Sequence, residues 1–382
     1  MILRDLLCLK NGDREGEKMD INNQLAISIR GASHFASGKP VQDYSLAVKG
    51  EDFSIAVVCD GHGHDKHFRS EKGSELAALV TKNKLMEFFE HNNTWEIFND
   101  NTEKKLSHLK LSIITAWQIC IENYTKQNPF TEEELKKASS SFASRKDYDV
   151  AQPYGTTILA ALVCKEYYLV LMIGDGAISK IKSDYSASIV TFPGKKVFDD
   201  QPHSATDSLC EQDAYKKIYF SYEQIKDEIF AFGLCSDGMS EAFATDDILL
   251  AKINNYLNYY AEEGLDKATT AIEAQLNELS KISSMKDDIS LAFATLYLEK
   301  FDKSKQVIPT IVSSANETME NENSTPSSTT QVDVESGTGD SSTDVTSADN
   351  KLEDGKSGKV DANINAEQSS VDNTDNGENP AS

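Results

Sequence analysis

The feature of this sequence that most restricts its fold is an apolar run that ends abruptly on an acid. Residues 53–59 read Phe-Ser-Ile-Ala-Val-Val-Cys, without Pro or Gly, which predicts a strand buried in a core. The run stops at Asp60-Gly61-His62-Gly63. Asp60 is therefore expected at the end of a buried strand.

The same pattern recurs along the chain. Apolar runs lead into Gly174-Asp175-Gly176 and into Ser236-Asp237-Gly238, and Asp287-Asp288 precedes a further apolar run. An Asp-Gly pair after a strand is also a common hairpin turn, and for Gly174-Asp175-Gly176 alone that interpretation is as good as a functional one. The repetition favours a shared site, in which strands of one core bring their acids to one rim.

Carboxylates gathered in this way repel one another, and a buried ionised acid is costly, so the site needs cations or raised pKa values. Ligands that are all oxygen atoms suit Mg²⁺ or Mn²⁺ rather than zinc. His62, His64 and His67 together suggest a zinc site as an alternative. Without cysteine ligands or a clear fourth partner, that alternative is weak.

Five motifs carry a family resemblance. In order and approximate spacing they resemble those of the metal-dependent type 2C Ser/Thr phosphatases: Asp60-Gly61-His62-Gly63, Tyr154-Gly155-Thr156-Thr157, Gly174-Asp175-Gly176, Ser236-Asp237-Gly238 and Asp287-Asp288-Ile289-Ser290. The similarity covers roughly residues 24–298. Upstream, Gly31-Ala32-Ser33-His34 and the segment 38–43 resemble the opening signature of a bacterial branch of that family.

The resemblance implies an α+β fold, a four-layer αββα sandwich of two antiparallel sheets flanked by helical pairs. It also implies hydrolysis of phosphoserine and phosphothreonine monoesters by water activated between two Mg²⁺ or Mn²⁺ ions. Asp60 would bridge the ions, the Gly61 carbonyl would bind one of them, and Asp237 and Asp287 would complete the main set of ligands. Asp175 matches the position associated with a weaker third ion.

His62 matches the general acid that protonates the leaving Ser or Thr oxygen. The alternative is a structural histidine that hydrogen-bonds a metal-bound water or a neighbouring acid. His64 replaces a glycine usual in the family, and we expect it to pack at a helix start.

Two positions depart from the family pattern. Gln42 stands where many relatives have a metal-binding Glu, and Gly38 stands where they have a phosphate-binding Arg. We still place Gln42 at the metals, but the site then has one negative charge fewer, because alternation along an extended segment is expected to point Asp43 away. A comparatively high metal requirement follows.

Composition divides the chain into three parts. Residues 1–22 form a polar leader, residues 23–300 the phosphatase domain, and residues 301–382 a disordered acidic tail without any aromatic residue after Phe301. Within the domain, apolar periodicity predicts a hairpin over 44–59 and two helical pairs, at 76–89 with 106–124 and at 246–260 with 265–282. Residues 31–43 are expected to be a loop, and residues 191–214 a flap beside the site.

Charge and cysteine usage restrict the partners and the compartment. The net charge is −24; residues 311–382 contribute 15 acids and 3 lysines, or −12, so the remainder also carries −12. Such a surface argues against nucleic acid, whose phosphates need clustered Lys and Arg. Six scattered cysteines without a CxxC pair fit a reducing compartment. No signal peptide or membrane span is evident, so we expect a cytoplasmic monomer whose partner is a phosphorylated protein.

Two other functions remain open from the sequence. One is a catalytically weak regulatory protein that keeps the fold and binds a phosphorylated partner, although the retention of Asp60, Asp237 and Asp287 counts against it. The other is a phosphatase that acts on a small phosphoester, which the motifs do not distinguish from a protein phosphatase.

Overall fold

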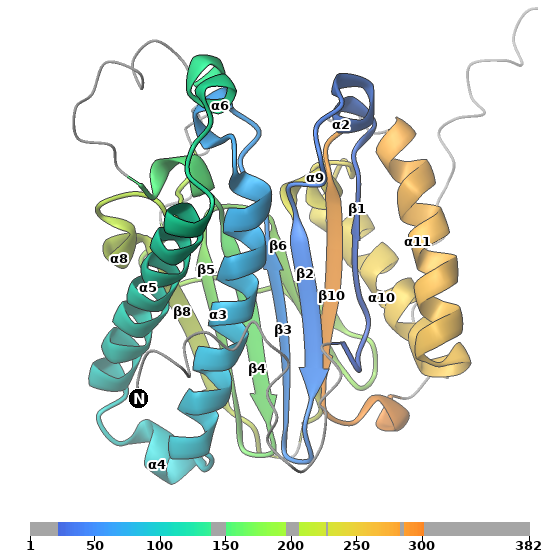
Figure 1. Cartoon of the computed structure of the whole chain (residues 1–382). Helices are drawn as coiled ribbons and strands as arrows, with labels where there is room; N and C mark the ends of the chain where they lie inside the picture. The colour runs from blue at the N-terminus through green and yellow to red at the C-terminus, as the bar shows by residue number, and fades with distance from the viewer. Residues whose placement is uncertain (1–21, 139–149, 196–205, 227, 283–285, 302–382) are drawn as a thin grey trace, which may run out of the picture. The chain divides into compact units, whose positions relative to one another are not determined.

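A computed structural model describes residues 22–138, 150–195, 206–226, 228–282 and 286–301 (Figure 1). By its internal contacts the chain divides into Met1–Val312 and Ser313–Ser382, and all described residues belong to the first unit. Almost all of the expected leader and tail lies outside the described residues. Of the helices described, none combines the length and the hydropathy that crossing a bilayer requires.

In the described part of the chain, ten strands form two antiparallel sheets of five. The first sheet has the order β1-β10-β9-β6-β7 and the second β2-β3-β4-β5-β8. The strands are β1 (Ala26–Ile29), β2 (Tyr44–Lys49), β3 (Phe53–Cys59), β4 (Ile158–Cys164), β5 (Tyr167–Ile173), β6 (Ala177–Lys182), β7 (Ala187–Ile189), β8 (Tyr219–Gln224), β9 (Phe230–Cys235) and β10 (Ile289–Thr295).

The helices lie mainly in two pairs. The α-helices are α2 (Ala32–Ser37), α3 (Ser70–His91), α4 (Trp95–Asn99), α5 (Thr102–Gln127), α6 (Glu132–Lys137), α8 (Ala214–Lys217), α9 (Asp237–Ser240), α10 (Asp246–Glu263) and α11 (Leu265–Ile282). Short 3₁₀ helices are η1 (Asp65–His67), η2 (Gln152–Tyr154) and η3 (Leu298–Lys300). Threonine side chains at positions 94, 131 and 245 accept from backbone N–H groups at helix starts, as N-caps do.

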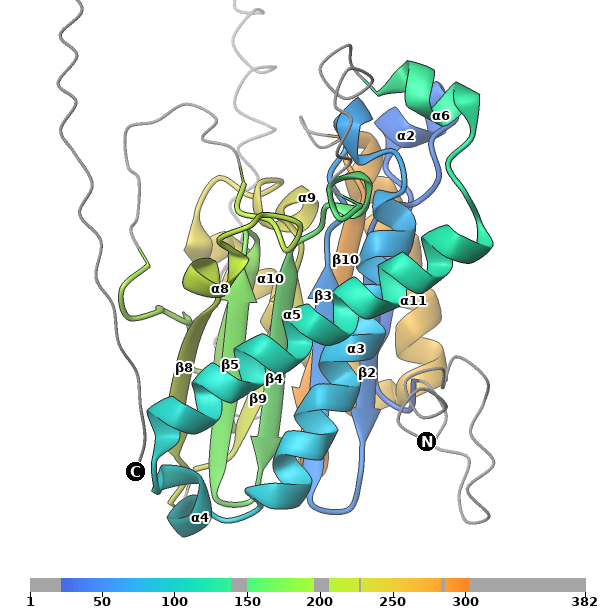
Figure 2. The same ribbon diagram turned by 60° about the vertical axis from the view of Figure 1, so that its left-hand side comes forward.

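Among the described residues, three apolar cores separate four layers. One core joins α3 and α5 to β2–β5, a second joins α10 and α11 to β1, β6, β9 and β10, and a third lies between the facing sheets. Figures 1 and 2 show the two helical pairs on opposite outer faces of the sheets. The predicted αββα sandwich is confirmed.

Most predicted elements are present, but two segments differ. The hairpin pairs Tyr44 with Cys59, and both helical pairs form as expected. The supposed loop at 31–43 contains helix α2, because Gly38 adopts φ of 75° and caps the helix with its N–H on the Phe35 carbonyl. The end of the expected flap runs into the short helix α8, and strand β8 begins only at Tyr219.

The topology brings the strand-end acids to one end of both sheets. Asp43 precedes β2 and Asp60 follows β3, and these strands are antiparallel neighbours. Likewise β6 and β9 pair Ala177 with Cys235, so the turn before β6 and the turn after β9 lie side by side. This is the end near α2 and α9 in Figure 1.

Helix α3 lies very close to η2 at the end of the sheets where the acids gather, and this contact holds that end together. A Cβ on Gly73 would lie 2.0 Å from the Tyr154 carbonyl oxygen, and the Gly73 carbonyl accepts from Trp117 Nε1 at 3.1 Å. Only glycine fits here without moving α3 away from the segment that begins with Tyr154.

We predict that Gly73→Ala lowers the free energy of unfolding by about 1–3 kcal/mol through overpacking. Urea denaturation measures the change. The matched control is Asn83→Ala on the exposed side of the same helix, expected within about 0.5 kcal/mol of wild type. Equal stability of the Gly73 variant and wild type would show that the contact is not tight.

Candidate functional site

Three of the predicted acids meet at the end of the sheets. Oxygen atoms of Asp60, Asp175 and Asp237 all lie within 4.8 Å of one another. They follow β3, β5 and β9 respectively, as the sequence pattern predicts. All three side chains keep some exposure to solvent, so an ion and water can reach them.

The Tyr154-Gly155-Thr156-Thr157 motif holds Asp60 in place. Asp60 N–H donates to Thr157 Oγ1 at 3.0 Å, while Thr156 Oγ1 and Thr157 N–H both donate to the Asp60 carbonyl at 2.8 Å. Gly61 forms a bridge with Thr156, and a Cβ on Gly61 would lie 2.4 Å from the Gln42 carbonyl oxygen. Asp60 therefore sits on a backbone fixed from both sides.

Asp43 lies close to this group of acids, although the sequence led us to expect it to point away from the metals. Burial raises its pKa well above the usual range, the Asp288 charge adds to this, and contacts with the Ser236 and Ser290 hydroxyls oppose it. Its charge also contributes to the raised pKa of Asp60, which counts against the expectation that Asp43 points away from the site. Continuing the β2–β3 register one residue beyond Tyr44 and Cys59 sets Asp43 opposite Asp60, and the sequence already contained that signal.

The electrostatics of the cluster call for a cation. Burial raises the pKa of Asp60 well above its ordinary value, and the charges of Asp43 and Asp237 raise it further. Asp237 Oδ1 and Asp43 Oδ2 are buried without a hydrogen-bond partner. A hard divalent ion supplies both the charge and the missing bonds, so these residues fit the metals implied by the sequence.

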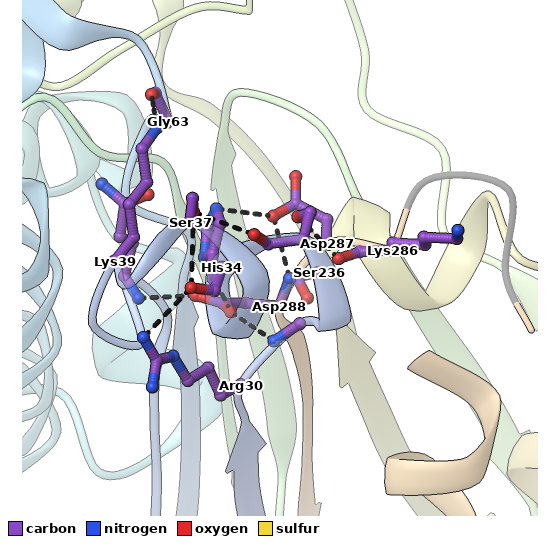
Figure 3. A network of polar contacts seen from close by, with 12 residues as sticks. Arg30, His34, Ser37, Lys39, Gly63, Ser236, Lys286, Asp287 and Asp288 are labelled. Atoms are coloured by element: carbon purple, nitrogen blue, oxygen red, sulfur yellow. Dashed lines mark hydrogen bonds and ion pairs between the residues drawn. The ribbon is translucent and has the colours of Figure 1, made fainter. Parts of the chain in front are cut away.

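Asp287 lies beside this cluster in a second group. It joins His34 and Asp288, with potential ligand atoms again within 4.8 Å of one another (Figure 3). The Asp237 charge contributes to a raised pKa of Asp287, for which burial is the main cause. Asp287 and Asp237 are thus electrostatic neighbours, and the Asp287 side chain is 43% exposed.

Gln42 places an amide oxygen in the same region. Its Nε2 donates to Ser70 Oγ and to the His62 carbonyl, whereas Oε1 is buried and has no partner. A Cβ built on Gly63 would lie 3.8 Å from this Oε1. An amide oxygen is a ligand for Mg²⁺ and Mn²⁺, although it adds no charge.

His62 is held next to a second histidine. The rings of His62 and His67 are 4.9 Å apart, and His67 Nδ1 donates to the Gln152 carbonyl at 2.5 Å. Burial lowers the pKa of His62 to about 4 and that of His67 to about 3, so both are neutral at pH 7. His64 Nδ1 accepts from Lys66 N–H at the start of η1, so His64 stands at a helix start as expected and caps it.

These histidines do not form a zinc site within the described part of the chain. Neither described group of three potential ligands contains His62, His64 or His67. The zinc alternative therefore gains no support.

A cleft of about 590 Å³ opens beside His62. Its lining comes from two stretches of chain and from Gln152: His62, Gly63, His64, Lys66 and His67 after β3, and Thr206, Ser208, Cys210, Glu211, Gln212 and Asp213 of the expected flap. Thr206 Oγ1 donates to Asp175 Oδ2 at 2.6 Å, which links the flap side of the cleft to the acid cluster. Residues 196–205 of the flap lie outside the described residues.

Comparison with protein families decides the assignment. The family model for protein phosphatase 2C matches residues 30–278, which is more than half of the chain. The chain belongs to the protein phosphatase 2C family. It is accordingly a metal-dependent Ser/Thr phosphatase, as the sequence motifs predicted. The match ends at residue 278, before Asp287. The assignment of Asp287 to the site therefore rests on the geometry described above.

Solved structures of bacterial phosphatases are similar to this phosphatase. Ser/Thr phosphatase Stp1 from Staphylococcus aureus aligns with 16% identity over 74% of this chain and 98% of its own, with a TM-score of 0.44. The PstP/Ppp phosphatase of Mycobacterium tuberculosis aligns with 15% identity over 72% and 98%, with a TM-score of 0.40. A PstP catalytic domain in complex with two manganese ions aligns with 16% identity over 72% and 97%, with a TM-score of 0.41. A comparison with curated proteins finds no match.

The raised pKa of Asp60 predicts how the metal-free protein responds to pH. A carboxyl whose pKa is higher in the folded state binds its proton more readily there, so stability falls as pH rises through that pKa. Asp60→Asn removes this loss. We expect the metal-free variant to melt above wild type at about pH 8, with the difference shrinking toward about pH 4.

Thermal unfolding in EDTA tests this expectation. The control is Glu90→Gln, an exposed acid on α3, expected to stay within about 0.5 kcal/mol of wild type at both pH values. A metal-free Asp60 variant that melts below wild type at about pH 8 would contradict the repulsion described here.

Proposed function

We propose that this phosphatase hydrolyses phosphoserine and phosphothreonine in proteins with two Mg²⁺ or Mn²⁺ ions held by Asp60, Gly61, Asp237, Asp287 and Gln42. The observation that carries the assignment is the convergence of Asp60, Asp175 and Asp237 within 4.8 Å, with Asp237 Oδ1 unpartnered. Asp43, close enough to raise the pKa of Asp60, supplies the fourth negative charge that Gln42 lacks. The site then balances two divalent ions without a Glu at position 42.

Two divalent cations lower the pKa of a water nucleophile and neutralise the phosphoryl oxygens. The chain's part is to place the ligands. Asp60 would be the ligand shared by the two ions, because it stands on the fixed Thr156–Thr157 backbone and other acids lie close to it. Asp175 would hold a third ion, and its hydrogen bond from Thr206 ties that position to the flap.

His62 is proposed as the proton donor to the leaving Ser or Thr oxygen. Its Nε2 is buried without a partner, and its ring lines the cleft. Because its pKa is lowered to about 4, the proton must be stabilised by the bound phosphoryl dianion, whose charge raises that pKa. His67 supports the orientation of the ring by packing against it.

Many relatives have a phosphate-binding Arg at the position of Gly38. We propose that the neighbouring Lys39 attracts the phosphoryl group instead. Its Nζ donates to the Gly63 carbonyl at 2.6 Å, which holds the ammonium at the loop after Asp60. An ammonium has three donors, so two remain for phosphate oxygens.

The substrate and its setting are part of the same proposal. We propose that the cleft of about 590 Å³ beside His62 receives a segment of a phosphorylated protein, rather than a small phosphoester alone. The described cysteines are free thiols, which supports a reducing compartment such as the cytoplasm. We propose that the enzyme acts there as a monomer, away from nucleic acid and membranes.

Release of phosphate from a phosphothreonine peptide tests the assignment. Wild type should turn over with Mn²⁺ and stop in EDTA, and Asp237→Asn should lose at least about 10²-fold in kcat, because the neutral amide withdraws a ligand charge. Asp246→Asn, on the exposed start of α10, is the control. Peptide binding without turnover in wild type would favour a regulatory protein instead.

The domain boundaries give a second prediction. A chain ending at Lys305 should keep the melting temperature and the turnover of the full chain, because the segment beyond it offers almost nothing to bury and ordering it costs roughly 1–2 kcal/mol per residue. Calorimetry and hydrolysis of p-nitrophenyl phosphate compare the two proteins. A lower melting temperature in the short chain would mean that the domain extends into the tail.

A further inference from the structure

Asp288 is a buried carboxylate that organises the loop around helix α2. Its side chain is 2% exposed and accepts the Gly31 N–H at 2.6 Å on Oδ1 and the Gln42 N–H at 2.5 Å on Oδ2. Both ends of the segment 31–42 are therefore tied to one side chain, which fixes its orientation. Figure 3 shows Asp288 at the centre of this network.

The imidazole of His34 is held between Asp288 and Asp287. Its Nδ1 lies 2.9 Å from Asp288 Oδ1, and its Nε2 lies 3.4 Å from Asp287 Oδ1. An ionised carboxylate has no hydrogen to donate, so the close contact of Nδ1 with Asp288 favours a proton on Nδ1. In the neutral ring the lone pair then belongs to Nε2, on the side of Asp287.

Helix α2 leaves this ring little freedom. Ser33 donates to the Lys286 carbonyl through its N–H at 2.9 Å and its hydroxyl at 2.8 Å, and Arg30 donates to the His34 carbonyl at 3.0 Å. The His34 residue itself is 7% exposed. The hydrogen bonds of Ser33 and Arg30 therefore fix the backbone that carries the His34 ring.

The separation of His34 Nε2 from Asp287 Oδ1 suits two ligands of one ion. If each ligand is about 2.1 Å from the ion, atoms 3.4 Å apart subtend an angle of about 110°, near the tetrahedral value and about 20° above the octahedral one. Asp287 is 43% exposed, so the ion has a path from solvent and room for water ligands.

A second observation points to the same space. The nearest atoms to a Cβ built on Gly63 are Gln42 Oε1 at 3.8 Å and His34 Nε2 at 4.0 Å, with nothing nearer. Gln42 is 6% exposed and its Oε1 has no partner. An oxygen and a nitrogen, each able to bind a cation, therefore border one open space beside Gly63.

We propose that His34 Nε2 is a ligand of the divalent ion that Asp287 holds, with Asp288 orienting the ring. The proposal rests on the proposed function in one respect, that Asp287 binds an ion. A metal-bound histidine usually donates its other ring N–H to a carboxylate, as Nδ1 of His34 would donate to Asp288. That contact makes the metal-binding nitrogen, here Nε2, a stronger ligand. Imidazole also favours transition metals over Mg²⁺, so the site prefers Mn²⁺.

Pulsed electron paramagnetic resonance of the Mn²⁺-loaded full chain tests this directly. A histidine nitrogen bound to Mn²⁺ gives a hyperfine coupling that changes when the protein is grown with ¹⁵N-labelled histidine. We expect that change in wild type, so the result does not depend on the folding of a variant. We expect the coupling to be absent in His34→Gln and retained in His91→Gln, an exposed histidine at the end of α3.

Calorimetric titration measures the selectivity of the site for Mn²⁺ over Mg²⁺. His34→Gln should lose about tenfold or more of its Mn²⁺ affinity and less of its Mg²⁺ affinity, and Asp288→Asn should lose about tenfold of its Mn²⁺ affinity. Equal losses for the two ions in His34→Gln would overturn the proposed ligand role.

The outcomes separate this inference from the proposed function. Mn²⁺-dependent turnover without any histidine coupling would leave the proposed function intact and overturn the role of His34. A coupling that persists in His34→Gln would also overturn it, because another histidine would then be the ligand. If wild type and Asp60→Asn both failed to bind Mn²⁺, the metal assignment itself would fall, and the inference with it.

Discussion

Repulsion between carboxylates is the constraint on which this structure depends. The chain brings Asp43, Asp60 and Asp237 close enough that burial and mutual charge raise the pKa of Asp60, and it leaves buried oxygens without donors. Without a cation, such an arrangement costs stability. Two layers of sheet with three apolar cores hold the acids together against that cost.

The site is built by backbone contacts more than by the acids themselves. Thr156 and Thr157 fix Asp60, and Asp288 fixes the segment that carries His34 and Gln42. Each of these supports joins elements far apart in the sequence, so the acids move little relative to one another. Rigid placement is what a two-metal site requires, because ligands that must reorganise bind ions weakly.

Much of the fold was predictable from local patterns. The apolar run before Asp60 and the helical periodicity at 76–89 and 106–124 are strong signals, because burial on one face leaves a regular pattern. Helix α2 was not predicted, since its six residues are too few to show a period. The shortness of the helix, rather than its composition, is the reason that the sequence pattern did not reveal it.

Some residues of the site were also predictable from local sequence patterns, and others were not. Asp60, Asp175 and Asp237 were recognisable because each ends an apolar run, and the structure brings them together. Asp43 was expected to point away because alternation was counted from Gln42, whereas continuing the hairpin register one residue beyond Tyr44 and Cys59 sets Asp43 opposite Asp60. The contacts of His34 and Asp288 span more than 250 residues of chain, and no local pattern reports such a pairing.

Anomalous scattering from crystals grown with Mn²⁺ tests the central claim most directly, because it locates the ions without reference to activity. The account predicts strong peaks bordered by the carboxylate of Asp60, with Asp237 and Asp287 among the neighbouring ligands and His34 Nε2 within bonding distance of the ion on Asp287. Crystals of the active enzyme with manganese peaks elsewhere, or with none at the strand ends, would contradict it.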